Sequence, residues 1–267
     1  MPASRSRKRE PDPPAAPRRR WPIVLAAVLL IGTAVVIALP ASLITRLLPP
    51  SIHAEDFSGS IWHGSAARIT LNSRPVGALE WRLHPLSLLL MSPAADLHWV
   101  KGSTVIDGSL AVDAHGFVAH DVHGGGPIED LRDLGIAAGW HGNTTLNLRE
   151  VKGSFSALAS ATGTLEVSAL ASTRIAAGSD LGSYQVSFAP DAIDADGVSA
   201  TIRDIGGPLE CQAEIHYTAA SRAGLLSGTL KERPEASQAL RNELSNLSQL
   251  KPRDSSGRIP VDLEFAM

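Results

Sequence analysis

The sequence predicts a mainly β protein, in which a single N-terminal transmembrane helix is followed by an elongated, mostly antiparallel β-sheet domain with a few short helices. Three observations lead to this fold class. An uncharged apolar run fills residues Ile23 to Leu39, apolar and polar residues alternate in many of the segments after it, and Gly, Asn or Asp separates those segments. A period of two places successive side chains on opposite faces, which is the pattern of half-buried antiparallel strands.

The apolar run has the length of one membrane span. As a helix, Pro22 to Leu39 would be about 27 Å long, close to the roughly 30 Å of hydrocarbon that a span must cross. Pro22 suits the first turn, and Pro40 ends the run. A cleaved signal peptide is the alternative, but its apolar region is usually shorter, and Pro40 interrupts the only place for a cleavage site. We therefore expect a transmembrane anchor at residues 21–40.

The charge on either side of this anchor predicts its orientation. Residues 1–20 hold seven basic and two acidic side chains, a formal +5, whereas the whole chain carries −3, so the remainder carries −8. A basic flank stays in the cytoplasm, which makes residues 1–20 a disordered basic cytoplasmic tail and places the C-terminal domain in the periplasm of a Gram-negative bacterium, at the inner membrane. The acidic balance of the exported part argues against nucleic acid or anionic head groups as its main partners.

The exported part is predicted to form one domain. Residues 41–56 are expected to be a juxtamembrane collar, with a short helix through Leu48 that ends at Pro49 and Pro50, and residues 57–267 a periplasmic β-domain. Aromatic residues make up only 4% of the chain, so Ala, Val, Leu and Ile must build the core. The lone Cys211 cannot form an intrachain disulfide, so the fold does not depend on oxidation.

The clearest strand is Leu209 to Tyr217, where odd positions are apolar and even positions polar. The same alternation recurs elsewhere and predicts roughly ten to twelve strands, in one long twisted sheet or a pair of sheets. The dipeptides expected to form turns are Gly102-Ser103, Asp107-Gly108, His115-Gly116, Gly142-Asn143, Asp196-Gly197 and Ser256-Gly257.

Three segments interrupt the strand pattern with helical spacing, namely Pro85 to Met91, Pro127 to Ala138 and Pro234 to Leu250. The last is the clearest, because it places four apolar side chains on one face, those of Ala236, Leu240, Leu244 and Leu247. We expect this helix to cover a sheet face or to plug an open end of the sheet. Docking of a partner is the alternative role.

The sequence contains no credible metal site. Asp191, Asp194 and Asp196 precede a glycine as in a calcium loop, but Ile205 stands where the bidentate Glu is needed, so a polar hairpin turn is expected. The three histidines His115, His120 and His123 suggest zinc, yet His120 and His123 would point to opposite faces of a strand.

Catalytic motifs are also missing from the sequence. Gly124-Gly125-Gly126 lacks the Lys-Ser/Thr and the helix of a phosphate-binding loop, so we expect a flexible turn there. No Ser stands in a nucleophile elbow, and the carboxylates are scattered over polar strand faces. We therefore expect a protein that is not an enzyme and that has no cofactor.

Several strings in this order resemble the type II secretion system protein N family, also called general secretion pathway protein N. They are Gly59-Ser60-Ile61-Trp62-His63-Gly64-Ser65-Ala66, the stretch from Val76 through Trp81 and Pro85 to Leu89, Leu181-Gly182-Ser183-Tyr184, Ile202 through Gly206-Gly207-Pro208 to Leu209, and Gly228-Thr229-Leu230 before Arg233-Pro234. The resemblance covers the anchor and the chain from about Phe57 to its end.

The resemblance implies an accessory inner-membrane component of the pathway that moves folded proteins from the periplasm to the exterior. Its implied partners are other type II secretion subunits, namely inner-membrane platform proteins and, across the periplasm, the outer-membrane secretin. The family is not enzymatic, so the resemblance implies no catalytic, cofactor-binding or metal-binding residue. The motif residues are expected to be structural, and they are Gly59, Trp62, Gly64, Trp81, Pro85, Gly206, Gly207 and Pro208.

For these residues the sequence itself favours structural roles. Trp62 and Trp81 are expected to pack between facing strands, Gly64 to set a turn, and Gly206-Gly207-Pro208 to form a bend before the longest strand. Two other functions stay open. One is a membrane-tethered periplasmic carrier of a lipid or another hydrophobic ligand, with an open groove in the sheet, and the other is a membrane-anchored hydrolase.

Overall fold

The computed structural model describes residues 39–46, 50–89, 92–175, 178–189, 197–221 and 223–266. The expected basic tail lies outside these ranges, and so does the expected anchor except for its last residues. The chain divides into two units, residues 1–39 and 40–267, and the description below concerns the second unit by itself. Within the described ranges, none of the helices combines the length and the hydropathy of a membrane span.

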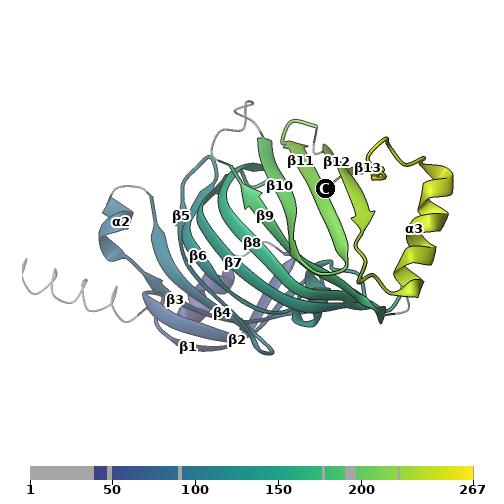
Figure 1. The fold of residues 1–267 in the computed structure, drawn as a ribbon. Helices are drawn as coiled ribbons and strands as arrows, with labels where there is room; N and C mark the ends of the chain where they lie inside the picture. Colours follow the sequence, from purple (N-terminus) through teal and green to yellow (C-terminus); the bar gives the residue numbers. More distant parts are fainter. Residues whose placement is uncertain are drawn as a thin grey trace, which may run out of the picture. The chain divides into compact units, whose positions relative to one another are not determined.

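Thirteen strands form a single antiparallel sheet whose spatial order is the order of the chain (Figure 1). The strands are β1 (Ile52–Gly59), β2 (His63–Leu71), β3 (Arg74–Leu83), β4 (Ala94–Lys101), β5 (Thr104–Val112), β6 (Phe117–Pro127), β7 (Trp140–Gly153), β8 (Leu158–Ser172), β9 (Asp180–Phe188), β10 (Gly197–Gly206), β11 (Leu209–Thr218), β12 (Ala223–Glu232) and β13 (Ile259–Ala266). Each strand therefore pairs only with its neighbours in sequence, and β1 and β13 are the two edges.

The mainly β fold class is confirmed, and the sheet is single and longer than the ten to twelve strands expected. The alternation in Leu209–Tyr217 appears as β11, where Leu209, Ala213 and Tyr217 are buried and Gln212 is exposed. The stretch expected to be the collar contains the start of β1, which begins at Ile52. Burial alternates along β1 from Ile52 to Glu55 and is interrupted at Asp56, where φ is +57°.

Within the described ranges, four short helices accompany the sheet, namely η1 (Ala41–Arg46), α2 (Pro85–Leu89), η2 (Ile128–Leu134) and α3 (Gln238–Leu250). Each lies within a segment for which the sequence predicts helix. The first and third are 3-10 helices. The start of α3 differs from the expected Pro234, because the Ser237 side chain accepts a hydrogen bond from the Leu240 N–H and caps the helix there.

Several predictions of turns at glycine are wrong, because these glycines lie inside strands. Gly108 lies within β5 and Gly142 within β7, and at both positions the register with the neighbouring strand shifts. Gly124 to Gly126, expected to be a flexible turn, belong to β6. A Cβ at Gly126 would lie 2.2 Å from Thr104 Oγ1, so close approach of the strands explains glycine there.

Turns do occur at Gly102-Ser103, His115-Gly116 and Ser256-Gly257, as the sequence predicts. Gly197 begins β10, while Asp196 and the rest of the expected polar hairpin turn, residues 191–196, lie outside the described residues.

The sheet twists strongly and curls, and α3 lies beside its C-terminal strands (Figure 1). Three separate clusters of buried residues make up the core. One joins α3 to the sheet through Leu240, Leu244 and Ile259, one surrounds Trp81 near β1 to β4, and one surrounds Tyr217 and Val198. A helix therefore contributes buried residues to the core only where it packs against the sheet.

Candidate functional site

The family-motif residues near β2 and β3 form part of a packed cluster around Trp81. The Trp81 ring is buried, its Nε1–H donates to the Ile61 carbonyl at 3.0 Å, and it meets Phe57 edge to face with ring centroids 6.3 Å apart. A Cβ at Gly64 would lie 2.8 Å from this ring, so Gly64 makes room for it. Gly64 lies inside β2 rather than in the expected turn. At Gly59, φ is +80°, a conformation that favours glycine.

Trp62 and Pro85 complete this part of the motif. Trp62 lies half-buried in the bend between β1 and β2, and its carbonyl accepts a hydrogen bond from the Leu83 N–H at 2.7 Å. Pro85 is exposed and begins α2, where a missing N–H costs nothing. None of these contacts presents a reactive group.

Gly206, Gly207 and Pro208 form the bend between β10 and β11, six strands away from the Trp81 cluster. At Gly207 φ is +113°, and a Cβ there would lie 2.3 Å from the Gly182 Cα. The bend is held by Arg233, whose guanidinium donates to the Gly207 carbonyl and pairs with Asp204. It does not precede the longest strand, which is β8. The structure therefore divides the motif residues between two places rather than gathering them into one site.

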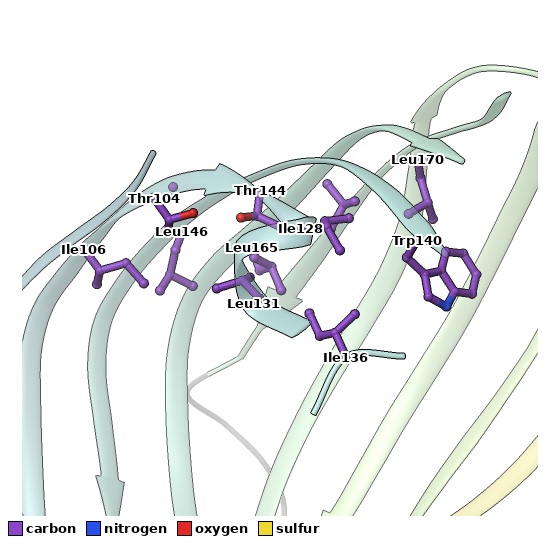
Figure 2. Close-up of a pocket in the computed structure, with 12 residues that line it drawn as sticks. Thr104, Ile106, Ile128, Leu131, Ile136, Trp140, Thr144, Leu146, Leu165 and Leu170 are labelled. Atoms are coloured by element: carbon purple, nitrogen blue, oxygen red, sulfur yellow. The ribbon is translucent and has the colours of Figure 1, made fainter. Parts of the chain in front are cut away.

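The feature with the character of a binding site is an apolar groove on the face of the sheet that carries η2 and α3. Its first part is a cavity of about 330 Å³ between η2 and strands β5 to β8 (Figure 2). In Figure 2, Leu131 and Ile136 lie below the sheet and Ile106, Leu146 and Leu165 project from it toward them. Thus η2 covers this part of the groove.

The second part is a cavity of about 710 Å³ between α3 and strands β7 to β12. From α3 it is lined by Leu240, Glu243, Leu244 and Leu247, and from the sheet mainly by aliphatic side chains. Three residues, Trp140, Val167 and Leu170, line both cavities. The two cavities are therefore neighbours on one face, and we call them together the inner groove.

The hydroxyl groups that line the inner groove already donate to protein oxygens. Thr104 Oγ1 donates to Asp130, Thr144 Oγ1 to the Gly126 carbonyl and the Tyr184 OH to the Leu181 carbonyl. Burial raises the pKa of the Tyr184 phenol, and burial followed by the nearby Asp204 raises the pKa of the Cys211 thiol to about 11. Both groups therefore stay uncharged at neutral pH, and Cys211 is no nucleophile.

A network of acidic residues fixes η2 over the groove. Asp130 accepts hydrogen bonds from the backbone N–H groups of Ser103 and Thr104 at 2.9 and 3.2 Å, which is the main reason why its pKa is lowered. Asp133 pairs with Lys101 at 2.7 Å. The helix η2 is thus tied at both Asp130 and Asp133 to the end of β4 and the turn between β4 and β5.

A small polar cavity of about 220 Å³ lies over β2 to β5 and has a different character. Within it His98 Nδ1 lies 2.6 Å from Asp107 Oδ1, and the hydrogen bond that the imidazolium donates to this carboxylate raises the pKa of His98. Among the described residues, no group of three His, Cys, Asp or Glu side chains could hold a metal ion. His120 and His123 have separate partners, Glu150 and the Asp121 carbonyl. His120 thus takes part in an ion pair and His123 in a hydrogen bond to the backbone, and both side chains are exposed.

Comparison with known proteins decides the family. The family model of the type II secretion system protein N matches residues 50–262, which run from β1 into β13. The chain belongs to this family. The match therefore covers almost the whole sheet, including both places that hold the motif residues and the inner groove.

Two curated relatives carry the same name, type II secretion system protein N. The one from Vibrio cholerae is 33% identical over 84 residues, which is 31% of this chain and 32% of the relative. The one from Aeromonas hydrophila is 33% identical over 82 residues, 29% of this chain and 32% of the relative. The aligned segments thus span about a third of the relatives' length. No solved structure matches the chain.

The sequence analysis identifies the protein N motif residues and offers an open groove in the sheet as an alternative, but it does not name the residues that line the inner groove. Its lining comes from β5 to β12 and two helices, and only the helical face of Leu240, Leu244 and Leu247 was identified beforehand. The available signal was that the apolar faces of many consecutive strands are built from Leu, Ile and Val while too few helices exist to cover them.

Proposed function

We propose that this chain is an accessory component of the type II secretion pathway that supports the transport of folded proteins from the periplasm to the exterior through contacts with other proteins. The observation that carries the proposal is the match of the protein N family over residues 50–262. The family's name describes a component of a secretion system and not an enzyme, and the motif residues have packing and backbone roles. A structural, non-catalytic role agrees with both the family's name and the roles of the motif residues.

We propose that the domain works in the periplasm, held to the inner membrane by residues 21–40. What supports this is the uncharged run before Pro40 and the seven basic residues ahead of it. The partners we propose are other subunits of the secretion system, namely inner-membrane platform proteins and the outer-membrane secretin. The edges of the sheet, β1 and β13, are suitable for pairing with a partner strand, because each has one hydrogen-bonded neighbour.

The test is deletion of the gene in its own host. Secretion of type II substrates should fall and the substrates should accumulate in the periplasm, because their export across the inner membrane does not use this pathway. The control is the deletion strain that carries the full chain with a periplasm-dependent reporter after Met267, in which secretion and reporter activity should both appear. Unchanged secretion in the deletion strain would remove the proposal, and an inactive reporter on a chain that restores secretion would reverse the orientation.

Carriage of a hydrophobic ligand is a second candidate function. The comparisons do not support it, and the one observation in its favour is the inner groove. The chemistry of that groove can be argued separately from secretion.

A further inference from the structure

We propose that the inner groove binds the acyl chain of a phospholipid. The proposal does not rest on the secretion role, because it concerns only the cavities under η2 and α3. Their volumes, about 330 and 710 Å³, fall in the range of cavities that hold small-molecule ligands. Since Trp140, Val167 and Leu170 line both cavities, a long and narrow ligand can follow the sheet from one into the other.

The lining favours a ligand without polar groups. All but a few of the lining side chains are aliphatic or aromatic, and Glu243 is the one charged residue among them. Glu243 lies exposed on α3, so it marks the outside of the groove. Each methylene group that leaves water for such a surface contributes about 0.8 kcal/mol. An aliphatic chain gains along its whole length, and a charged head group stays in solvent.

An extended peptide is a poor occupant, because its backbone would lack hydrogen-bond partners. Each residue of a peptide brings an N–H and a C=O group whose burial without a partner costs free energy. The hydroxyls of Thr104, Thr144 and Tyr184 already donate to protein oxygens. The backbone groups of the lining strands pair within the sheet, since the groove lies over its interior strands. An acyl chain needs no such partners.

A helix of a partner protein could not be enclosed by the groove. A helix about 10 Å in diameter fills roughly 120 Å³ per residue, so even the larger cavity of about 710 Å³ would hold about six residues, fewer than two turns. A single acyl chain is much narrower than a helix and can be enclosed along its length.

The groove also reaches the surface through apolar residues. Ile136, in the connection from η2 to β7, and Ile175, at the end of β8, line the cavities and are both partly exposed. Such residues at the rim let an acyl chain enter while it keeps contact with apolar surface. Leu170 and Trp140, which line both cavities, lie close together in Figure 2.

The chain supplies a matched pair of positions for the test. Leu226 on β12 lines the larger cavity, whereas the adjacent Leu225 points to the other face and is 42% exposed. On β10, Ile202 lines the cavity and Ile205 is 50% exposed. The two residues of each pair are of the same type and lie on the same strand, and one of them lies inside the groove while the other lies outside it.

The experiment places a photoreactive phenylalanine derivative at each of these four positions in the full chain, expressed in cells grown with radioactive phosphate. After irradiation of intact cells, the chain is purified under denaturing conditions, and the label at the position of the monomer is measured. We expect several-fold more phospholipid label at Leu226 and Ile202 than at Leu225 and Ile205. Because the readout is attached phospholipid, a failure of the secretion role leaves it unchanged.

Two results would overturn the proposal. One is equal or absent label inside and outside the groove in chains that resist protease before irradiation, and the other is a larger cross-linked species without phosphate label, which would identify a protein as the occupant. A folding defect caused by the probe at one lining position does not block the test, because the other lies on a different strand. Leu165 on β8 provides a third position, in the smaller cavity.

Discussion

Gly206 and Gly207 are neighbours in the bend between β10 and β11, but only one of them needs to be glycine for steric reasons. Gly207 has φ of +113°, and an added Cβ would lie 2.3 Å from the Gly182 Cα, which is itself backbone and cannot move aside. A Cβ at Gly206 would meet no atom within 4 Å. Backbone strain of this kind costs of the order of 1–3 kcal/mol per residue.

We therefore predict that Gly207→Ala lowers the free energy of unfolding of the full chain by at least the strain of about 1–3 kcal/mol, because the clash with Gly182 adds to this strain. The matched control is Gly206→Ala, which should change stability by no more than about 0.5 kcal/mol. Denaturant unfolding of both variants measures the difference. Equal stability of the two would mean that the bend can relax.

The motif residues also show how far single residues can be interpreted without a structure. Trp81 is a large apolar residue in a clear alternation, so its burial could be expected from the sequence. The need for glycine at position 64 could be noticed but not explained, because the ring that it faces belongs to the next strand. Residue types indicate that a position is special, while the cause lies in a neighbour that only the register identifies.

At the scale of elements, α3 is attached to the sheet by one face. Leu240 is 2% exposed and packs with Leu244 and Ile259, whereas Leu250 at the end of the same helix is 82% exposed. Its cap at Ser237 accepts a hydrogen bond from the Leu240 N–H, and the Ser237 hydroxyl donates to Ser179 Oγ at 3.0 Å. The stability of α3 therefore depends on a few buried side chains rather than on its length of 13 residues.

We predict that Leu240→Ala lowers the free energy of unfolding by about 2–5 kcal/mol, because it leaves a cavity between α3 and the sheet. Leu250→Ala is the control on the same helix, with an expected change of no more than about 0.5 kcal/mol. Thermal or denaturant unfolding of the full chain provides the measurement. A similar loss for both variants would show that α3 packs differently from the arrangement described here.

Elements in which apolar residues recur at a regular period could be predicted from the sequence, whereas irregular elements could not. The segment with nine alternating residues forms β11, and the segment with Leu240 on its apolar face forms α3. The glycines at 108 and 142 predict turns because glycine is the usual turn residue, but in both places glycine accommodates a shift of register inside a strand. Sequence cannot separate these cases, since both use the same freedom of the glycine backbone.

At the scale of the whole molecule, the inner groove depends on features that no local pattern contains. It needs the curl of the sheet and the placement of η2 and α3, which are more than 100 residues apart in the chain, on one face. The alternation of apolar and polar residues predicts a sheet with one apolar face, but it does not determine whether a second sheet or helices cover that face. The outcome, partial cover by two short helices, is set by the topology.

The topology also implies an uneven distribution of stability, because every strand pairs only with its neighbours in sequence. Interior strands have partners on both sides, and β7 and β8 are the longest, with 14 and 15 residues. The edge strands β1 and β13 have one partner each, although Ile259 at the start of β13 is fully buried against α3. Local opening should therefore begin at the edges.

We predict that backbone amides exchange with deuterium most slowly in β7 and β8 and fastest in β1 and in the part of β13 after Ile259. Hydrogen exchange of the full chain, followed by mass spectrometry of its peptides, measures this order. The control is a dilution series, because self-association through an edge would slow exchange there only at high concentration. If β1 or β13 exchanged as slowly as β8 at every concentration, the edges would not be the weak points that the strand order implies. Slower exchange at one edge after a secretion subunit is added would identify that edge as the contact surface.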